Sequence, residues 1–388
     1  MLMKQKLFTV AVIADIHIGA IKSDILYNEL KEGFLNFIKD KYLDMIVIAG
    51  DFFNSIISLN SQSAMKAFQF MRELIDICEK NEINYVRVIE GTLSHDNFQI
   101  LNFQNYESNK KVDFKIITTV KEENLSNGLN ILYLPEEYME DPVSYYREYL
   151  CKPKKYYDFI FGHGMFKETS FTNDDSESYI SKAPIWNSKL LTSLCKGPIV
   201  FGHIHTSQII RKHIYYTGSF SRWVYGQEED KGFYIFAYHI ESGKYLAEFI
   251  QNKLARQFDT IKIYLEKALE SQSVDELIKH IKLFKKDNLR IQVLVETIQK
   301  DYSLPISLLK EYFTGKPGYK FELIDLREKA QHQEMEEKIN KLSSDYEFLF
   351  DDQLPIQEKI HKFIKRKYKK DVSEEKIMDL LNINSENK

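Results

Sequence analysis

Several short motifs between residues 15 and 205 carry the residue types that bind metal ions. Asp15 and His17 end an apolar run in the segment ADIHIG, and residues two apart on an extended segment point to the same side. Asp51 ends the apolar run MIVIAGD, where the preceding Gly50 permits a tight turn. Two further runs end in FGHG and FGHIH, and these contribute His163, His203 and His205. Carboxylates and imidazoles in this combination predict a site for divalent transition metals.

The elements that must position these residues are short β-rich runs. From residue 6 to about 165 such runs alternate with helical patterns, which predicts βαβ units and a sheet covered on both faces. We expect a helix over 25–38 and strands over 44–49, 84–89, 113–119, 129–134 and 157–161. Any one motif alone is most often a turn, a helix cap or a core histidine. Several runs that all deliver ligands to one sheet edge, where open α/β sheets bind, favour a functional site.

The pattern changes twice in the second half. Between residues 198 and 252 the helical patterns disappear, and the runs there predict successive antiparallel strands. Beyond Asn252 a small α/β domain is predicted, with elements over 257–264, 274–285, 289–296, 305–313 and 320–326. A charged helix or linker over 327–351 and one or two amphipathic helices over 355–382 follow. The predicted domains are 1–252, 253–327, 328–352 and 353–388.

Composition narrows the class of protein. With 44% hydrophobic and 28% charged residues the chain is expected to be globular, and its apolar runs are far shorter than a bilayer span. Because no signal-peptide pattern begins the chain, we expect a cytoplasmic protein with no membrane contact. The three cysteines, in no CxxC spacing, support neither a disulfide framework nor a zinc knuckle. A net charge of −4 neither requires nor excludes a nucleic-acid partner.

The motifs ADIH, AGDFF, GTLSHD, FGHG and FGHIH, followed by YYTGSFSRW and EEDKGF, resemble the calcineurin-like metallophosphoesterases. Within them, the chain resembles the SbcD-type double-strand-break nuclease subunits and their phage recombination counterparts over about residues 6–250. The resemblance implies an α/β fold, a β-sandwich flanked by helices, with a small α/β capping domain and a C-terminal helical segment. It also implies a metal-dependent DNA exonuclease and endonuclease that hydrolyses phosphodiester bonds at DNA ends in recombination and repair.

By the same resemblance, two divalent ions, most favourably Mn²⁺, are held by seven residues. One ion would be bound by Asp15, His17, Asp51 and His205, and the other by Asp51, Ser94, His163 and His203. Two ions about 3.5–4 Å apart can activate water and neutralise charge on a phosphodiester. His95 would be the general acid, with Asp96 orienting its imidazole.

The sequence departs from the family at Ser94 and Asn54, and the role of a third residue, Arg222, is open. Most members read GNHD, and Ser94 stands where the Asn ligates the second ion, so we expect weaker binding there in a working variant of the site. Asn54 replaces a histidine found in several relatives, and we expect either a hydrogen bond to DNA phosphate or a simple turn residue. Arg222 lies in a segment that would form the cleft wall. It would contact DNA or, as the better-supported alternative, pair with Glu228 or Glu229.

The remaining expectations concern partners and competing functions. In SbcD-like proteins the capping domain helps admit DNA ends, and the C-terminal helices dock on the coiled-coil base of an SbcC-like ABC-type ATPase. Ile356, Ile360, Phe363 and Ile364 form an apolar face at helical spacing, which would either bind that partner or pack on its own domain. A homodimer is implied through helices of the first half. The alternatives are a general metallophosphoesterase on smaller substrates and a non-catalytic scaffold of such a complex.

Overall fold

The computed structural model describes residues 7–169, 185–285, 287–296, 301–327, 347–349, 351, 353–369, 371–373 and 376–377. The chain divides into two compact units. The first comprises Met1–Thr260 and Phe284–Arg290, and the second Ile261–Leu283 and Ile291–Lys388. Among the described residues, none of the helices combines the length and apolar character needed to cross a bilayer.

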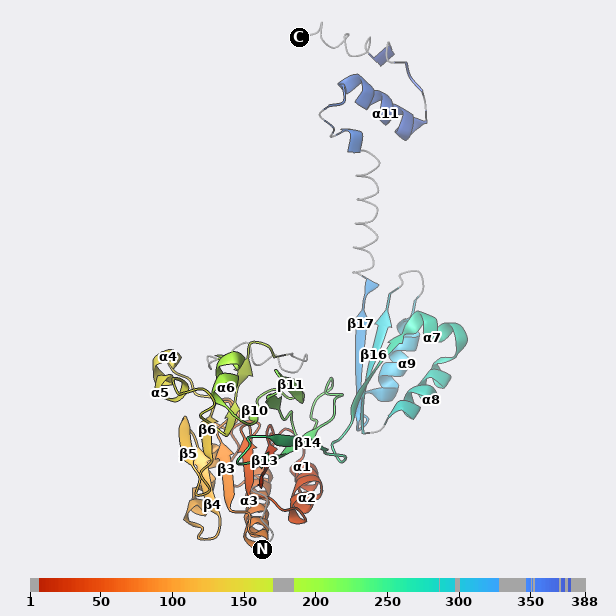
Figure 1. The fold of residues 1–388 in the computed structure, drawn as a ribbon. Helices are drawn as coiled ribbons and strands as arrows, with labels where there is room; N and C mark the ends of the chain where they lie inside the picture. Colours follow the sequence, from red (N-terminus) through yellow and green to blue (C-terminus); the bar gives the residue numbers. More distant parts are fainter. Residues whose placement is uncertain are drawn as a thin grey trace. The chain divides into compact units, whose positions relative to one another are not determined.

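The first unit, whose part up to Thr260 is coloured red through green in Figure 1, contains two six-stranded sheets. The first sheet has the order β14-β13-β1-β2-β3-β4. Its four parallel strands are β1 (Leu7–Ile13), β2 (Met45–Ala49), β3 (Tyr85–Ile89) and β4 (Asp113–Ile117). Two antiparallel strands, β13 (Gly232–His239) and β14 (Tyr245–Gln251), complete it beside β1.

The second sheet has the order β11-β12-β10-β7-β6-β5. Its parallel strands are β6 (Asn130–Leu134), β7 (Phe159–His163), β10 (Ile199–Gly202) and β12 (Ile214–Tyr216). Short antiparallel strands, β5 (Lys121–Asn124) and β11 (Gln208–Ile210), lie at the two edges. The predicted run of antiparallel strands over 198–252 is therefore wrong for β10. Because β11 turns the chain back before β12, β12 can lie parallel to β10.

Alternating residues along the strands build two cores. Val10 and Val12 of β1 belong to the core between the sheets, together with residues such as Phe161. Ala11 and Ile13 belong instead to the core on the other face of the first sheet. That core includes side chains of α1 (Ser23–Leu30) and α3 (Gln62–Asn81), and α6 (Ser188–Leu194) contributes to a third core over the second sheet. The predicted α/β sandwich flanked by helices is confirmed.

The helix predicted over 25–38 is present but is not uniform. It consists of α1, a π-helical segment η1 (Lys31–Leu35) and α2 (Asn36–Lys39). Gly33 lies within the π segment, where a Cβ atom would come 2.9 Å from the Oδ1 atom of Asn252. This close approach explains why a residue without a side chain occupies the middle of the helix.

The three-stranded sheet has the order β15-β16-β17, with bounds Phe258–Tyr264, Asn288–Val295 and Tyr319–Asp325. The helices described after β15 in the chain are α7 (Leu265–Ser271), α8 (Val274–Phe284), α9 (Ser303–Phe313) and α11 (Ile356–Tyr368). All except α7 were expected from the sequence. Most of the charged segment predicted over 327–351 lies outside the described residues, as does the end of the last predicted segment. The division into four domains stays a prediction.

Glu29 gives the first unit a pH-dependent term in its stability. The Glu29 side chain is buried in α1, and its carboxylate accepts a hydrogen bond from Asn252 Nδ2 at 3.3 Å. Burial raises the pKa of Glu29 from 4.5 to about 7. The protonated form is thus favoured by folding. The stabilisation that protonated Glu29 adds to the free energy of unfolding is complete below pH 4.5. It is lost once the pH has risen through 7.

We expect Glu29→Gln to remove this dependence, because glutamine is neutral at every pH. Relative to the variant, the wild-type free energy of unfolding should fall by about 3 kcal/mol between pH 4.5 and pH 8. Chemical denaturation of both proteins at several pH values measures the difference. A difference that stays constant over this range would contradict the assignment.

Candidate metal centre

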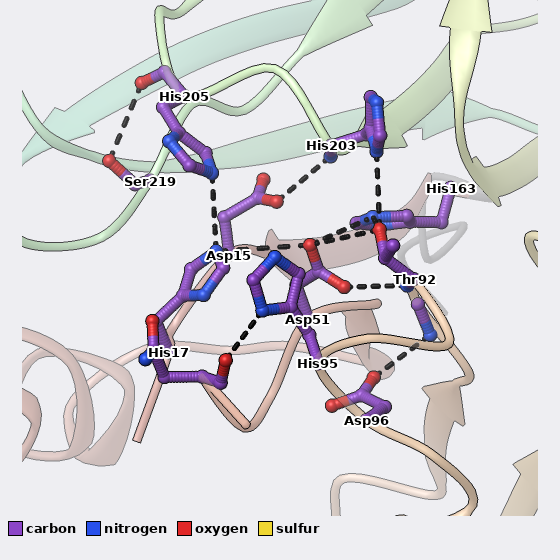
Figure 2. Close-up of polar contacts among 12 residues, drawn as sticks. Asp15, His17, Asp51, Thr92, His95, Asp96, His163, His203, His205 and Ser219 are labelled. Atoms are coloured by element: carbon purple, nitrogen blue, oxygen red, sulfur yellow. Dashed lines mark hydrogen bonds and ion pairs between the residues drawn. The ribbon is translucent and has the colours of Figure 1, made fainter. Parts of the chain in front are cut away.

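The predicted ligands lie where parallel strands of both sheets end (Figure 2). Asp15 and His17 follow β1, and Asp51 follows β2. His163 is the last residue of β7, and His203 follows β10 directly. Because the parallel strands end at the same edge, residues far apart in the sequence meet there.

The backbone of these loops is strained at four predicted ligands. Asp15, His17 and Asp51 have φ angles of +49°, +52° and +49°, and His203 has +94°. A residue with a side chain in this region costs about 1–3 kcal/mol, and such strain gathers at functional sites. Two hydrogen bonds hold the loops after β1 and β2 together, from Asp15 N to Gly50 O and from His17 N to Asp51 O.

Two glycines allow the close packing of the site. A Cβ atom on Gly50 would lie 2.1 Å from His163 Nδ1, and one on Gly91 would lie 2.2 Å from Asp51 Oδ1. His163 Nδ1 lies 2.9 Å from the carbonyl oxygen of Ala49. Since a carbonyl can only accept, Nδ1 carries the proton and Nε2 faces Asp51.

The first group of ligand-type side chains comprises Asp15, His17 and His205, whose ligand atoms lie within 4.8 Å of one another. His17 Nε2 and His205 Nε2 are 3.2 Å apart. Burial, reinforced by the nearby His205, lowers the pKa of His17 well below its usual value, so this imidazole is neutral. Asp15 Oδ1 accepts from His203 N at 2.9 Å, while its buried Oδ2 has no hydrogen-bond partner among the described residues. A neutral imidazole beside a buried carboxylate oxygen fits a cation.

The second group comprises Asp51, His163 and His203. Asp51 Oδ2 lies 3.2 Å from His163 Nε2 and 3.8 Å from His17 Nε2, so it lies between the two groups (Figure 2). Burial would raise the pKa of Asp51, but His163 outweighs it and lowers this pKa well below its usual value. Burial likewise opposes the charge on His163, yet Asp51, Asp15 and Glu136 raise its pKa to about 10. These carboxylates make the pocket favourable for positive charge.

The structure brings Thr92, rather than the expected Ser94, among these side chains. Thr92 N donates to Asp51 Oδ1 at 2.6 Å, and Thr92 Oγ1 lies 3.3 Å from His203 Nδ1 and 3.4 Å from His163 Nε2. Ser94 is exposed to solvent. The reason is the turn that begins at Thr92, whose carbonyl accepts from the backbone of both His95 and Asp96. Residues 93 and 94 lengthen this turn, so the residue directly after Gly91 faces the site.

Glu136 is a site residue that the sequence analysis missed. It follows β6 in the segment LPEE and is 5% exposed. Its Oε2 lies 3.0 Å from His203 Nδ1, 3.9 Å from His163 Nε2 and 3.3 Å from Thr92 Oγ1. A polar residue just beyond the end of a parallel strand was the signal that identified the other ligands, and it applied here too.

His95 and Asp96 are both at the centre, but they do not contact each other in the predicted way. The ligand atoms of His17, Asp51 and His95 lie within 4.8 Å of one another. His95 Nδ1 lies 2.6 Å from the carbonyl oxygen of Asn54, which therefore orients the ring in place of Asp96. Asp96 instead accepts from Phe53 N and Gly91 N, both at 2.8 Å, and so ties the loops after β2 and β3 together. Asn54 thus contacts His95 through its backbone, and a hydrogen bond from its side chain to DNA phosphate stays a prediction.

The side chain of Arg222 is buried and bonds to the backbone of neighbouring loops. Its buried guanidinium donates to the carbonyl oxygens of Ala255, Arg256 and Glu229. These bonds agree with the structural role that the sequence analysis favoured for Arg222, and the expected partner Glu229 is engaged through its backbone carbonyl rather than its carboxylate. A contact of Arg222 with DNA stays a prediction. The next residue, Trp223, packs against the first group, with its ring 4.5 Å from that of His17 and 4.9 Å from that of His205.

The sequence matches no family model and no curated protein. Among solved structures, the fold is similar to a dimetal phosphatase from Danio rerio, at 9% identity and a TM-score of 0.36, over 63% of this chain and 99% of that one. A hypothetical protein from Thermus thermophilus is similar at 13% identity and a TM-score of 0.34, with the same two coverages. A mutant cold-active protein tyrosine phosphatase is similar at 13% identity and a TM-score of 0.28, over 63% of this chain and 80% of that one. These values are too low to transfer an activity, so any function must be supported by the site itself.

The placement of Thr92 leads to a paired mutational test. We expect Thr92→Val, which removes the hydroxyl but keeps the shape, to weaken binding of the second Mn²⁺ ion by about 10-fold. Ser94→Ala should leave the affinity unchanged, because this hydroxyl is exposed. Isothermal titration with MnCl₂ measures both. Weaker binding by the Ser94 variant alone would restore the original assignment.

Proposed function

We propose that this chain is a metal-dependent phosphoesterase that uses two divalent ions. The observation that supports it most directly is the position of Asp51, whose carboxylate lies between the two groups of buried and partly buried ligand-type side chains. Each group offers imidazole nitrogens and carboxylate oxygens, the donor set expected for Mn²⁺, Fe²⁺ or Zn²⁺. When bound, such a pair of ions supplies Lewis-acid chemistry that activates water and neutralises charge on a phosphoryl group.

Thr92 and His95 would have different roles in this hydrolysis. Thr92 fixes the Asp51 carboxylate through its backbone N–H and its hydroxyl. The carbonyl of Asn54 keeps the proton of His95 on Nδ1, which leaves Nε2 as the atom that can hold and deliver a second proton. His95 in its doubly protonated form would then protonate the leaving oxygen as a general acid.

More specifically, we propose that this phosphoesterase is a DNA nuclease of the SbcD type, which works with Mn²⁺ at DNA ends in recombination and repair. Its support is the order of the sequence motifs and the second compact unit, for which a phosphatase of small substrates has no evident need. An SbcC-like ABC-type ATPase and a second copy of the chain are the proposed partners. On α11, Ile360, Phe363 and Ile364 are half-buried and Ile356 is 61% exposed. Co-purification with a co-expressed ATPase, compared between wild type and Ile356→Asp, tests the ATPase as a partner. Sedimentation of the free chain tests the second copy.

Parallel assays on two substrates distinguish this function from its alternatives. With MnCl₂ we expect wild-type protein to hydrolyse both linear double-stranded DNA and bis(p-nitrophenyl) phosphate, and Asp51→Asn to lose both activities. Hydrolysis of the small substrate alone would support the general phosphoesterase. If neither substrate is hydrolysed while the metal is bound, the non-catalytic scaffold is favoured and the enzyme is excluded.

A variant of His95 tests the general acid on the same two substrates. His95→Asn should lower kcat on DNA by about 10²–10⁴-fold, because the leaving sugar oxygen needs a proton. The loss on bis(p-nitrophenyl) phosphate should be much smaller, since nitrophenolate leaves readily without one. Equal losses on both substrates would instead indicate that His95 serves metal or substrate binding.

A further inference from the structure

We propose that Glu136 is an anionic ligand of the second metal ion, acting beside the hydroxyl of Thr92. The inference rests on the proposed two-ion function and names a residue that neither the motifs nor the family resemblance assigns to the centre. Its basis is the position of Glu136 Oε2, which is within 4 Å of three polar atoms of the second group. These atoms are His203 Nδ1 at 3.0 Å, Thr92 Oγ1 at 3.3 Å and His163 Nε2 at 3.9 Å.

The carboxylate of Glu136 is held so that this oxygen faces the second group. Tyr138 donates its hydroxyl hydrogen to Glu136 Oε1 at 2.7 Å. Because Tyr138 binds Oε1 of Glu136, the other oxygen, Oε2, faces His203, Thr92 and His163. A hydrogen bond that orients the carboxylate from outside is the usual arrangement around a metal-binding side chain.

The distribution of charge favours the same role. The first group has the carboxylate of Asp15 to itself and shares Asp51. Without Glu136, the second group has only its share of Asp51, together with two imidazoles and a neutral hydroxyl. Glu136 gives this group a carboxylate of its own, so the centre holds three carboxylates against two divalent ions. It thereby provides the binding strength that a threonine hydroxyl alone lacks.

This ligand set also bears on which metal is preferred. Carboxylate and hydroxyl oxygens suit Mn²⁺ and Mg²⁺, whereas imidazole-rich sites suit Zn²⁺. The second site combines two carboxylates, a hydroxyl and two imidazoles. We therefore expect Glu136 to raise the affinity of the second site for Mn²⁺ more than that for Zn²⁺.

The test compares wild-type protein with Glu136→Gln and with Glu140→Gln, which removes a charge from the same segment at an exposed position. Isothermal titration with MnCl₂ gives the number of ions and their affinities, and electron paramagnetic resonance detects the coupling of two neighbouring Mn²⁺ ions. We expect two ions in the wild type and in Glu140→Gln. In Glu136→Gln we expect one tight ion, a second weakened by at least about 10-fold, and loss of the coupled signal.

The outcomes separate this inference from the proposed function. Two ions of wild-type affinity in Glu136→Gln would overturn the role of Glu136 and leave the two-ion centre intact. Fewer than two ions in the wild type would overturn the two-ion centre itself. Circular dichroism without metal checks that Glu136→Gln folds. If it does not, Tyr138→Phe serves instead, because it releases the carboxylate at a partly exposed residue and should weaken only the second ion. Unchanged binding of both ions by a folded Tyr138→Phe protein would then count against the proposal.

Discussion

The burial of the Asp51 carboxylate between two sets of histidines is the interaction on which the rest of the site depends. A charged group at 2% exposure is strongly unfavourable unless positive charge or hydrogen-bond donors surround it. Here Thr92 N donates to one oxygen, and His163 and His17 lie near the other. The positive φ angles and the glycines without room for a side chain are the local means by which the backbone brings these groups so close.

Both sheets supply residues to the site. The first sheet supplies Asp15, His17, Asp51 and the loop from Thr92 to Asp96, and the second supplies Glu136 and three histidines. These residues meet because the parallel strands of both sheets end at one edge of the stack. The hydrophobic core between the sheets therefore fixes the distance between the ligand sets, and its packing is coupled to the geometry of the centre.

The ligand-type residues at strand ends could be predicted from the sequence, whereas those whose position depends on loop geometry could not. Asp15, Asp51 and His163 were found because each lies at the end of an apolar run, and such runs are buried strands. Ser94 was chosen by counting back from His95, but the turn after Gly91 is two residues longer than that count assumed. The direction of β10 escaped prediction because strand pairing depends on contacts distant in sequence. Glu136 was missed because none of the motifs includes it, although its position after β6 obeys the same rule.

Trp223 has a consequence for how this centre can be observed. Its indole ring packs against His17 and His205, whereas Trp186, the other tryptophan of the chain, lies in the core over the second sheet. One of the two indole rings is thus in contact with the first group, and the other is buried in the core over the second sheet. A paramagnetic ion held by the first group would therefore quench the emission of Trp223, so that tryptophan fluorescence would report metal binding.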